Sequence, residues 1–184
     1  MINADLLIRQ ANIKDAEQIM ALIRRAMTVY AHNSKIESSL ESLTETIHDI
    51  KQGIIDNYVL VAENRDGDLA GTVKLLLPVP MDDLPDVAQE QITDIADCNK
   101  RQSAVYAAWF TRFAVIPELH ASGVGKLIYQ AAEDYLVSQG ISIIMLHTAN
   151  TNRRLVNFYQ ARGFILAETD NSRGYERGLY IKQL

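Results

Sequence analysis

The feature that most constrains the fold is a strand-like segment that runs through a glycine turn into an amphipathic helix. From Trp109 to Leu136 the chain reads WFTRFAVIPELHASGVGKLIYQAAEDYL, and Gly123 and Gly125 stand where the helix begins. Glycines let the backbone approach a ligand closely, and the first turn of a helix presents unpaired N–H groups and a partial positive charge. The segment therefore predicts a strand, a turn and a helix whose N-terminus can hold a phosphate group. A glycine turn that does no more than begin a helix is an equally good interpretation of this segment alone.

Two common nucleotide-binding motifs do not fit this spacing. A dinucleotide-binding fingerprint needs a third glycine where Ile128 stands, and a nucleotide-triphosphate loop needs Ser or Thr where Leu127 follows Lys126. The segment predicts phosphate binding of another kind, in which the amides from Ala121 to Lys126 are the donors and the Lys126 side chain is a nearby cation.

The N-terminal third of the chain predicts one strand followed by two helices. Residues 6–11 read as a short strand, and Asn12 is a suitable N-cap for a helix with one buried face. After the polar stretch HNSKIESS, a second helix shows an apolar stripe and ends at Gly53. The apolar positions of the first helix are Ile13, Ala16, Ile19, Met20, Ile23, Met27 and Tyr30, and those of the second are Leu40, Leu43, Ile47 and Ile50.

The middle of the chain predicts an antiparallel hairpin and then an irregular insertion. The β-rich runs 58–64 and 69–77 flank an Asp-Gly turn at 65–68, which is a strong hairpin signal. Residues 78–103 contain three prolines and several acidic residues, and we expect them to form an insertion or a lid on the substrate side. A short helix within this insertion is expected around Val87, Ile92 and Ile95.

The rest of the chain returns to alternating strands and helices. The expected elements are a strand over 104–117, the helix that ends at Gly140, a strand over 141–148, a helix over 152–162 that stops at Gly163, and a hairpin of 164–169 with 175–183. The order is βααβββαβαββ, without internal repeats or a dividing linker. It predicts a single α/β domain over residues 1–184, with one mixed sheet and helices on both of its faces.

Charge and composition argue against several classes of protein. A net charge of −5 and a pI near 5.3 are unlike the basic face of a nucleic-acid-binding protein. The longest apolar runs fall short of the roughly 18 residues that a membrane span needs, and no signal or transit peptide is readable. Cys98 is the only cysteine, which excludes an internal disulfide and a cysteine-based zinc site, and it lies among charged residues as an incidental thiol. We expect a cytoplasmic protein without nucleic-acid, membrane or metal partners.

A second segment, one strand downstream, resolves the ambiguity of the first. It reads NRRLVNFYQARGF, from Asn152 to Phe164. HASGVG resembles the Arg/Gln-x-x-Gly-x-Gly/Ala signature of the GNAT superfamily of acyl-CoA-dependent N-acetyltransferases, and NRRLVNFYQARGF resembles its Asn-x-x-Ala-x-x-Phe-Tyr-x-x-x-Gly-Phe signature. The specific part of the resemblance runs from Arg112 to Phe164, and the element order extends it from about Leu6 to Leu184. It implies the mixed, mostly antiparallel central sheet of that family.

The resemblance also implies roles for individual residues. The backbone of Phe113, Ala114 and Val115 would pair with pantetheine amides, as a strand adds to a sheet edge. Asn152 would bond the pantetheine arm as well as cap its helix, and Tyr159 would protonate the departing sulfur as a general acid. Phe158, the neighbour of Tyr159, is expected in the core. The pyrophosphate would be held by His120, Ala121, Ser122, Gly123, Val124, Gly125 and Lys126.

The sequence departs from the family pattern in two places, at His120 and Leu155, and it also lacks the carboxylate base of some members. His120 replaces the usual Arg or Gln, and a histidine is largely neutral at pH 7, so only the backbone cradle for phosphate is retained in full. Leu155 replaces the usual Ala, which is a change of packing. Trp109 stands where some members have a carboxylate as general base. An alkylamine is protonated at pH 7, and freeing its lone pair costs roughly 4 to 5 kcal/mol, so a base or a water chain is needed. The candidate bases are Glu63, His147, His32 and Glu118.

These features predict an N-acetyltransferase that uses acetyl-CoA as cosubstrate and a primary amine as acceptor, by direct attack. The alternatives are an acyl-CoA-binding module without catalysis, and an acyltransferase with another acyl-CoA or a hydroxyl acceptor. The acceptor pocket should be framed by residues 32–39, the insertion 78–103 and the turn 170–174. Proteins that the chain resembles often pair as homodimers, although no apolar stripe in this sequence requires it.

Overall fold

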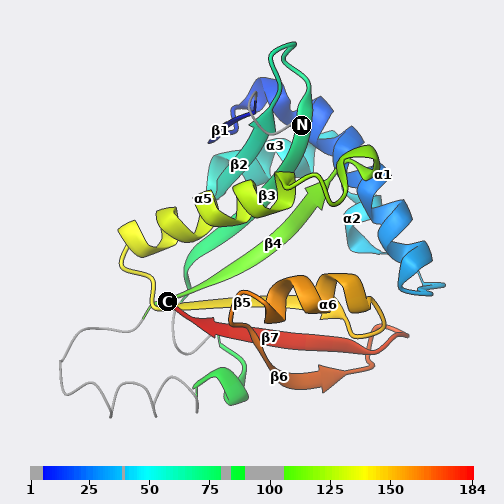
Figure 1. The fold of residues 1–184 in the computed structure, drawn as a ribbon, viewed down its shortest axis with the longest axis vertical. Coiled ribbons are helices and arrows are strands. Elements are labelled where there is room, and N and C mark those ends of the chain that lie inside the picture. The colour runs from blue at the N-terminus through cyan, green and yellow to red at the C-terminus, as the bar shows by residue number, and fades with distance from the viewer. Residues whose placement is uncertain (1–5, 39, 80–83, 90–105) are drawn as a thin grey trace.

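The computed structural model describes residues 6–38, 40–79, 84–89 and 106–184, and its centre is a seven-stranded sheet in the order β1-β2-β3-β4-β5-β7-β6 (Figure 1). The strands are β1 (Leu7–Gln10), β2 (Tyr58–Glu63), β3 (Leu69–Val79), β4 (Ala107–Val115), β5 (Ile143–Ala149), β6 (Ile165–Asp170) and β7 (Arg177–Gln183). The helices are α1 (Ala16–Asn33), α2 (Glu41–Thr44), α3 (Ile47–Asp56), α5 (Val124–Ser138) and α6 (Arg153–Gln160). Short 3-10 turns at Ile13–Asp15 and Pro117–Leu119 precede α1 and α5.

The pairing of the strands confirms a mixed, mostly antiparallel sheet. Both predicted hairpins are present, β2 with β3 and β6 with β7, and the pair of β4 with β5 is parallel. Helices lie on both faces, as expected. α1 and α3 pack their apolar stripes on one face, and α5 packs on the other through side chains such as Val124, Ile128 and Leu136.

The predicted second helix is divided into α2 and α3, which is a correction to the expected order. Thr46 begins a new helix, because its side chain accepts a hydrogen bond from the Asp49 N–H while the Asp49 carboxylate accepts one from the Thr46 N–H. Gly53, which was expected to end the helix, lies inside α3. The capping pair therefore decides where the helix begins, and the packing of α3 on the sheet overrides the weak helix propensity of glycine.

Part of the predicted insertion is described. β3 continues to Val79, and Leu84 and Ala88 are buried against side chains of β5 and β7. Residues 80–83 and 90–105 lie outside the described part of the chain, and with them Ile92, Ile95, Cys98 and the beginning of the strand expected at 104. None of the helices in the described part has the length and hydrophobicity that crossing a bilayer requires.

The pairing of β4 with β5 is short, and this creates an opening inside the sheet. Only Ala107–Trp109 of β4 pair with Ile143–Met145 of β5, although both strands continue further. A β-bulge bends β4 away from β5. Between Thr111 and Ala114, β4 contains one more residue than the stretch of β3 from Thr72 to Lys74 that it pairs with, and Arg112 has a left-handed φ of 50°. We call the diverging stretches, residues 110–115 and 146–149, the fork.

Candidate active site

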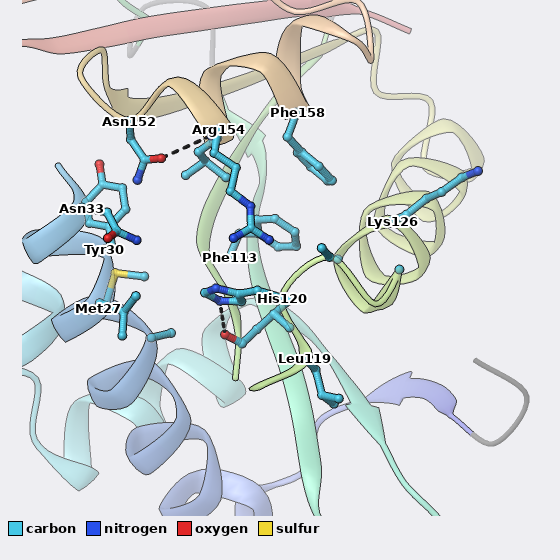
Figure 2. A pocket seen from close by; sticks show the side chains of 17 residues that line it. Met27, Tyr30, Asn33, Phe113, Leu119, His120, Lys126, Asn152, Arg154 and Phe158 are labelled. Atoms are coloured by element: carbon cyan, nitrogen blue, oxygen red, sulfur yellow. Dashed lines mark hydrogen bonds between the residues drawn. The ribbon is translucent and has the colours of Figure 1, made fainter. Parts of the chain in front are cut away.

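A cavity of about 360 Å³ adjoins the β4 stretch of the fork (Figure 2). It is lined by Phe113 and Val115 of β4, the loop from Leu119 into α5, the first half of α6, and the last turns of α1. Three of these four walls come from the segments that the sequence singled out. The fourth, α1, was expected only as a packing helix.

The glycine turn leaves several backbone donors free at the start of α5. Ala121 and Gly123 have positive φ values of 65° and 98°, which turn the chain sharply into the helix. Within the described residues, the N–H groups of Gly123, Val124, Gly125 and Lys126 have no hydrogen-bond acceptor. They stand at the positive end of a 15-residue helix, so this turn is suited to an anion.

The other predicted cradle residues contribute in different ways. The N–H groups of His120 and Ser122 already donate to the carbonyls of Pro117 and Leu119. Gly125 keeps the turn close to β4, because a Cβ added there would lie 3.2 Å from the ring of Phe113. Figure 2 shows the Lys126 side chain directed away from the cavity, so its contribution here is its backbone.

His120 lies in the cavity and is bonded to the strand behind it. Its Nε2 atom is 3.0 Å from the carbonyl oxygen of Val115, a distance at which an Nε2–H donates to that carbonyl (Figure 2). Val115 O is one of the backbone groups that were expected to pair with pantetheine. The imidazole therefore occupies, in this structure, a hydrogen-bonding position that a ligand along β4 would use.

The three predicted β4 residues divide between the two faces of the sheet. Phe113 and Val115 line the cavity, whereas Ala114 is buried on the other face among side chains of α1 and β2. Ala114 pairs with Thr72 of β3, and Val115 pairs with Gly71. The alternation follows from the two-residue period of a strand.

Asn152 is the N-cap of α6 and also binds the end of α1. Its side-chain oxygen accepts a hydrogen bond from the Leu155 N–H at 3.3 Å, and its Nδ2 donates to the Ser34 hydroxyl at 3.1 Å. The capping function is thus confirmed. One N–H of the carboxamide and one oxygen lone pair remain for a ligand in the cavity that Asn152 lines.

The positions of Tyr159 and Phe158 are the reverse of what was expected, since Phe158 was expected in the core and Tyr159 at the ligand. Tyr159 is only 4% exposed and packs in the core against Phe110, Phe113 and Phe164, while the half-buried Phe158 lines the cavity. Burial, and next the neighbouring Tyr30 hydroxyl, raise the pKa of Tyr159 well above its ordinary value. The phenol therefore keeps its proton throughout the neutral range.

None of the four candidate bases is among the residues that line this cavity. Glu63 is paired with Arg9 at the β1–β2 edge of the sheet, and Glu118 is paired with Arg25 at 2.7 Å. His32 is exposed on α1 and is not among the residues that line the cavity. The positions of these three give none of them a place next to a substrate in the fork.

His147 does lie at the fork, on β5. Its ring stacks on Trp109 with 5.0 Å between centroids and 14° between planes, so the pair spans the point where β4 and β5 separate. The ring is partly open to solvent, but desolvation by the surrounding protein, followed by the charges of Arg177 and Arg173, lowers the pKa of His147 to about 4. A base this weak stays neutral at pH 7 and takes a proton from an ammonium group poorly.

Several cavity residues were not assigned to the site from the sequence, and Tyr30 and Arg154 are two of them. Tyr30 was expected only as one more apolar position on α1, and Arg154 lay in the second signature segment without an assigned role. Figure 2 shows the Arg154 side chain reaching from α6 into the cavity, and no ion-pair partner for it occurs among the described residues. Its place two residues after the N-cap Asn152 was the only available signal.

Comparisons with known proteins agree with this arrangement. The model of the acetyltransferase (GNAT) family matches residues 20–164. Among solved structures, the PaiA N-acetyltransferase from Thermoplasma acidophilum, in complex with coenzyme A, is similar with a TM-score of 0.72 and 19% identity. The match covers 97% of this chain and 99% of that one. An acetyltransferase of the GNAT family from Streptococcus agalactiae has a TM-score of 0.70 at 19% identity, covering 97% and 95% of the two chains.

A chimera of the spermidine N-acetyltransferase SpeG from Vibrio cholerae and hSSAT is similar over 98% of this chain and 96% of that one, with a TM-score of 0.63 and 17% identity. At these identities the likeness concerns the fold. No curated protein sequence matches the chain.

Proposed function

Since the chain belongs to the GNAT family of acetyltransferases, we propose that it is an N-acetyltransferase that moves the acetyl group of acetyl-CoA onto a primary amine. One observation carries the proposal: a row of backbone N–H groups without acceptors, at the positive end of α5, borders a cavity that is also lined by the stretch of β4 that no longer pairs with β5. An elongated ligand with a pyrophosphate at one end and amides along its length fits both features. The coenzyme A bound to the Thermoplasma neighbour supports this assignment.

The phosphate end of the ligand lies at the α5 turn. The amides of Gly123, Val124, Gly125 and Lys126 donate to the pyrophosphate oxygens, and Arg154 supplies the positive charge that Lys126 was expected to supply. This placement accounts for the glycines as well, because a side chain at position 125 would meet Phe113.

The pantetheine arm lies along the β4 side of the fork, where the strand has lost its pairing with β5. Backbone groups of Phe113 to Val115 bond its amides, and the free N–H of Asn152 reaches it from α6. The His120 imidazole leaves the Val115 carbonyl when the arm binds, since both need the same oxygen.

The reaction is a direct transfer. The amine nitrogen bonds the thioester carbonyl carbon, the carbon–sulfur bond breaks, and its electron pair goes to the sulfur, which takes the Tyr159 proton. The Tyr159 phenolate then regains a proton from water. A backbone N–H of the β4 bulge near Val115 polarises the carbonyl. The proton that the amine loses leaves through water, because the side chains expected as bases are distant or too weak.

Replacing His147 with Gln tests that last step. We expect kcat to fall by less than about tenfold, because a base with a pKa near 4 contributes little to deprotonating an ammonium of ordinary pKa about 10.4. The acid limb of the kcat pH profile should remain in the variant. If kcat instead fell by about a hundredfold and the acid limb disappeared, His147 would be the base.

Replacing His120 with Arg tests the position that departs from the family signature. We expect the Kd for CoA to fall by about threefold to tenfold, because a guanidinium bonds phosphate bidentately and the imidazole no longer competes for the Val115 carbonyl. The gain should shrink as salt is raised. Calorimetric titration at two ionic strengths measures both effects, and equal affinity of the two proteins would place residue 120 away from the phosphates.

The function itself is tested by titrating the purified protein with acetyl-CoA in a calorimeter and then screening amines for release of free CoA thiol. We expect saturable binding with one ligand per chain, and thiol release that depends on an amine. Absence of acetyl-CoA binding would refute the proposal. Binding without turnover on any amine would favour the non-catalytic module.

A further inference from the structure

Tyr30 is a cavity residue with a polar group that the proposed reaction does not use. It lies in the last turns of α1, half-buried, and its ring lines the cavity on the side opposite the α5 turn (Figure 2). A tyrosine that serves only in packing has no need to place its hydroxyl at a strand edge, so the environment of that hydroxyl is informative.

The phenolic oxygen takes the place of a missing strand. The Ala149 N–H donates to it at 2.8 Å, and Ala149 belongs to the part of β5 that no longer pairs with β4. A buried backbone N–H needs an acceptor, so Tyr30 satisfies a donor that the fork leaves free. The hydroxyl is thereby fixed on the inner edge of the fork.

The hydrogen of the same hydroxyl has no comparable partner. Its nearest protein acceptor among the described residues is the Thr148 Oγ1, at 3.5 Å, which is long for a bond between two hydroxyls. An O–H group whose oxygen already accepts a backbone hydrogen bond is polarised and becomes a better donor. A strong donor without a good acceptor, on the wall of a ligand cavity, is suited to an acceptor on the ligand.

The end of α1 is held firmly enough to present this donor. Just beyond Tyr30, the Ser34 carbonyl accepts from the Thr151 hydroxyl at 2.9 Å, and the Ser34 hydroxyl accepts from Asn152 at 3.1 Å. Tyr30 is also near enough to Tyr159 for the two hydroxyls to interact electrostatically.

We propose that Tyr30 is a second hydrogen-bond donor to the sulfur of coenzyme A, opposite Tyr159. This inference rests on the proposed function. As the carbon–sulfur bond breaks and its electron pair moves to sulfur, Tyr159 transfers its proton to the sulfur, and the Tyr30 O–H stabilises the developing negative charge by a hydrogen bond without giving up its proton. The Ala149 N–H keeps the Tyr30 oxygen in place throughout.

The test compares the binding of CoA with that of desulfo-CoA, in which hydrogen replaces the thiol, by calorimetry at about pH 9, where much of an ordinary thiol is ionised. For Tyr30→Phe we expect CoA to bind roughly tenfold more weakly than to the wild type, because a hydrogen bond to a charged group is lost. Binding of desulfo-CoA should be unchanged, since that molecule has no sulfur to contact.

Thr148→Val is the matched control. It removes the 3.5 Å partner and keeps the shape of the buried side chain, so it should leave both affinities as they are in the wild type. Equal weakening of CoA and desulfo-CoA in Tyr30→Phe would overturn the inference and reduce Tyr30 to a structural residue. The same holds if Thr148→Val reproduces the effect of Tyr30→Phe. A wild-type protein that binds neither compound would refute the proposed function, and this inference with it.

Discussion

Replacing Gly123 with Glu should abolish acetyl-CoA binding, with a rise in Kd of at least about a hundredfold. The substituted side chain places a carboxylate where the pyrophosphate belongs, at the point where four N–H groups without acceptors converge. Repulsion between the two anions and the loss of several charge-assisted hydrogen bonds act in the same direction. Calorimetric titration of the variant beside the wild type measures the change.

The Gly123→Glu variant needs a control for backbone strain, because a φ of 98° strains any residue that has a Cβ. Gly140→Glu supplies it. Gly140 ends the same helix with a φ of 72°, and an added Cβ there meets no atom within 4 Å. Both variants carry one extra charge and similar strain, so similar losses of thermal stability are expected. If Gly140→Glu lost acetyl-CoA binding as well, the cradle at the α5 turn would not be the cause.

Replacing Tyr159 with Phe should lower kcat by about a hundredfold while leaving the KM for acetyl-CoA nearly unchanged. The ring packs among Phe110, Phe113 and Phe164, and phenylalanine fills the same space, so the fold should be as stable as before. Only the proton donor to the sulfur is removed. Steady-state rates of thiol release, together with a thermal melt, separate the chemical loss from any loss of folded protein.

Tyr129→Phe is the control for that measurement. Tyr129 belongs to the same aromatic cluster, but its hydroxyl is already engaged, because it accepts a hydrogen bond from Lys182 at 3.1 Å. The Tyr129→Phe variant should release thiol at a rate close to that of the wild type. If Tyr159→Phe also kept the wild-type rate, Tyr159 would be a core residue alone, and another group would protonate the sulfur.

Much of the architecture was predictable because local signals and global fold agree in this chain. The Asp-Gly turn specified the β2–β3 hairpin, Gly123 specified the turn into α5, and Asn152 specified the start of α6. The divided second helix was missed because Gly53 is a conspicuous helix terminator in sequence, whereas the capping pair of Thr46 and Asp49 is easily overlooked.

The cavity was predictable only where its residues are neighbours in sequence. The glycine turn before α5 and the signature segment of α6 are each made of residues close together in sequence, so their spacing alone predicted a ligand site. Tyr30 bonds Ala149 across 119 positions, and nothing in the amphipathic pattern of α1 distinguishes a packing tyrosine from one whose hydroxyl completes a strand edge. The direction of Lys126, away from the cavity, and of Arg154, into it, also depends on how two helices meet.

The fork has a further consequence for the solubility of the protein. A strand with unpaired N–H and C=O groups at the rim of a sheet is a template for pairing with another chain, and proteins that expose such strands risk aggregation. Here the stretch of β4 that has lost its pairing with β5 lines a cavity whose other walls are α1, α6 and the α5 turn. The unpaired backbone groups therefore lie inside a cavity, where they can bond a narrow ligand but cannot pair with a strand of another protein molecule.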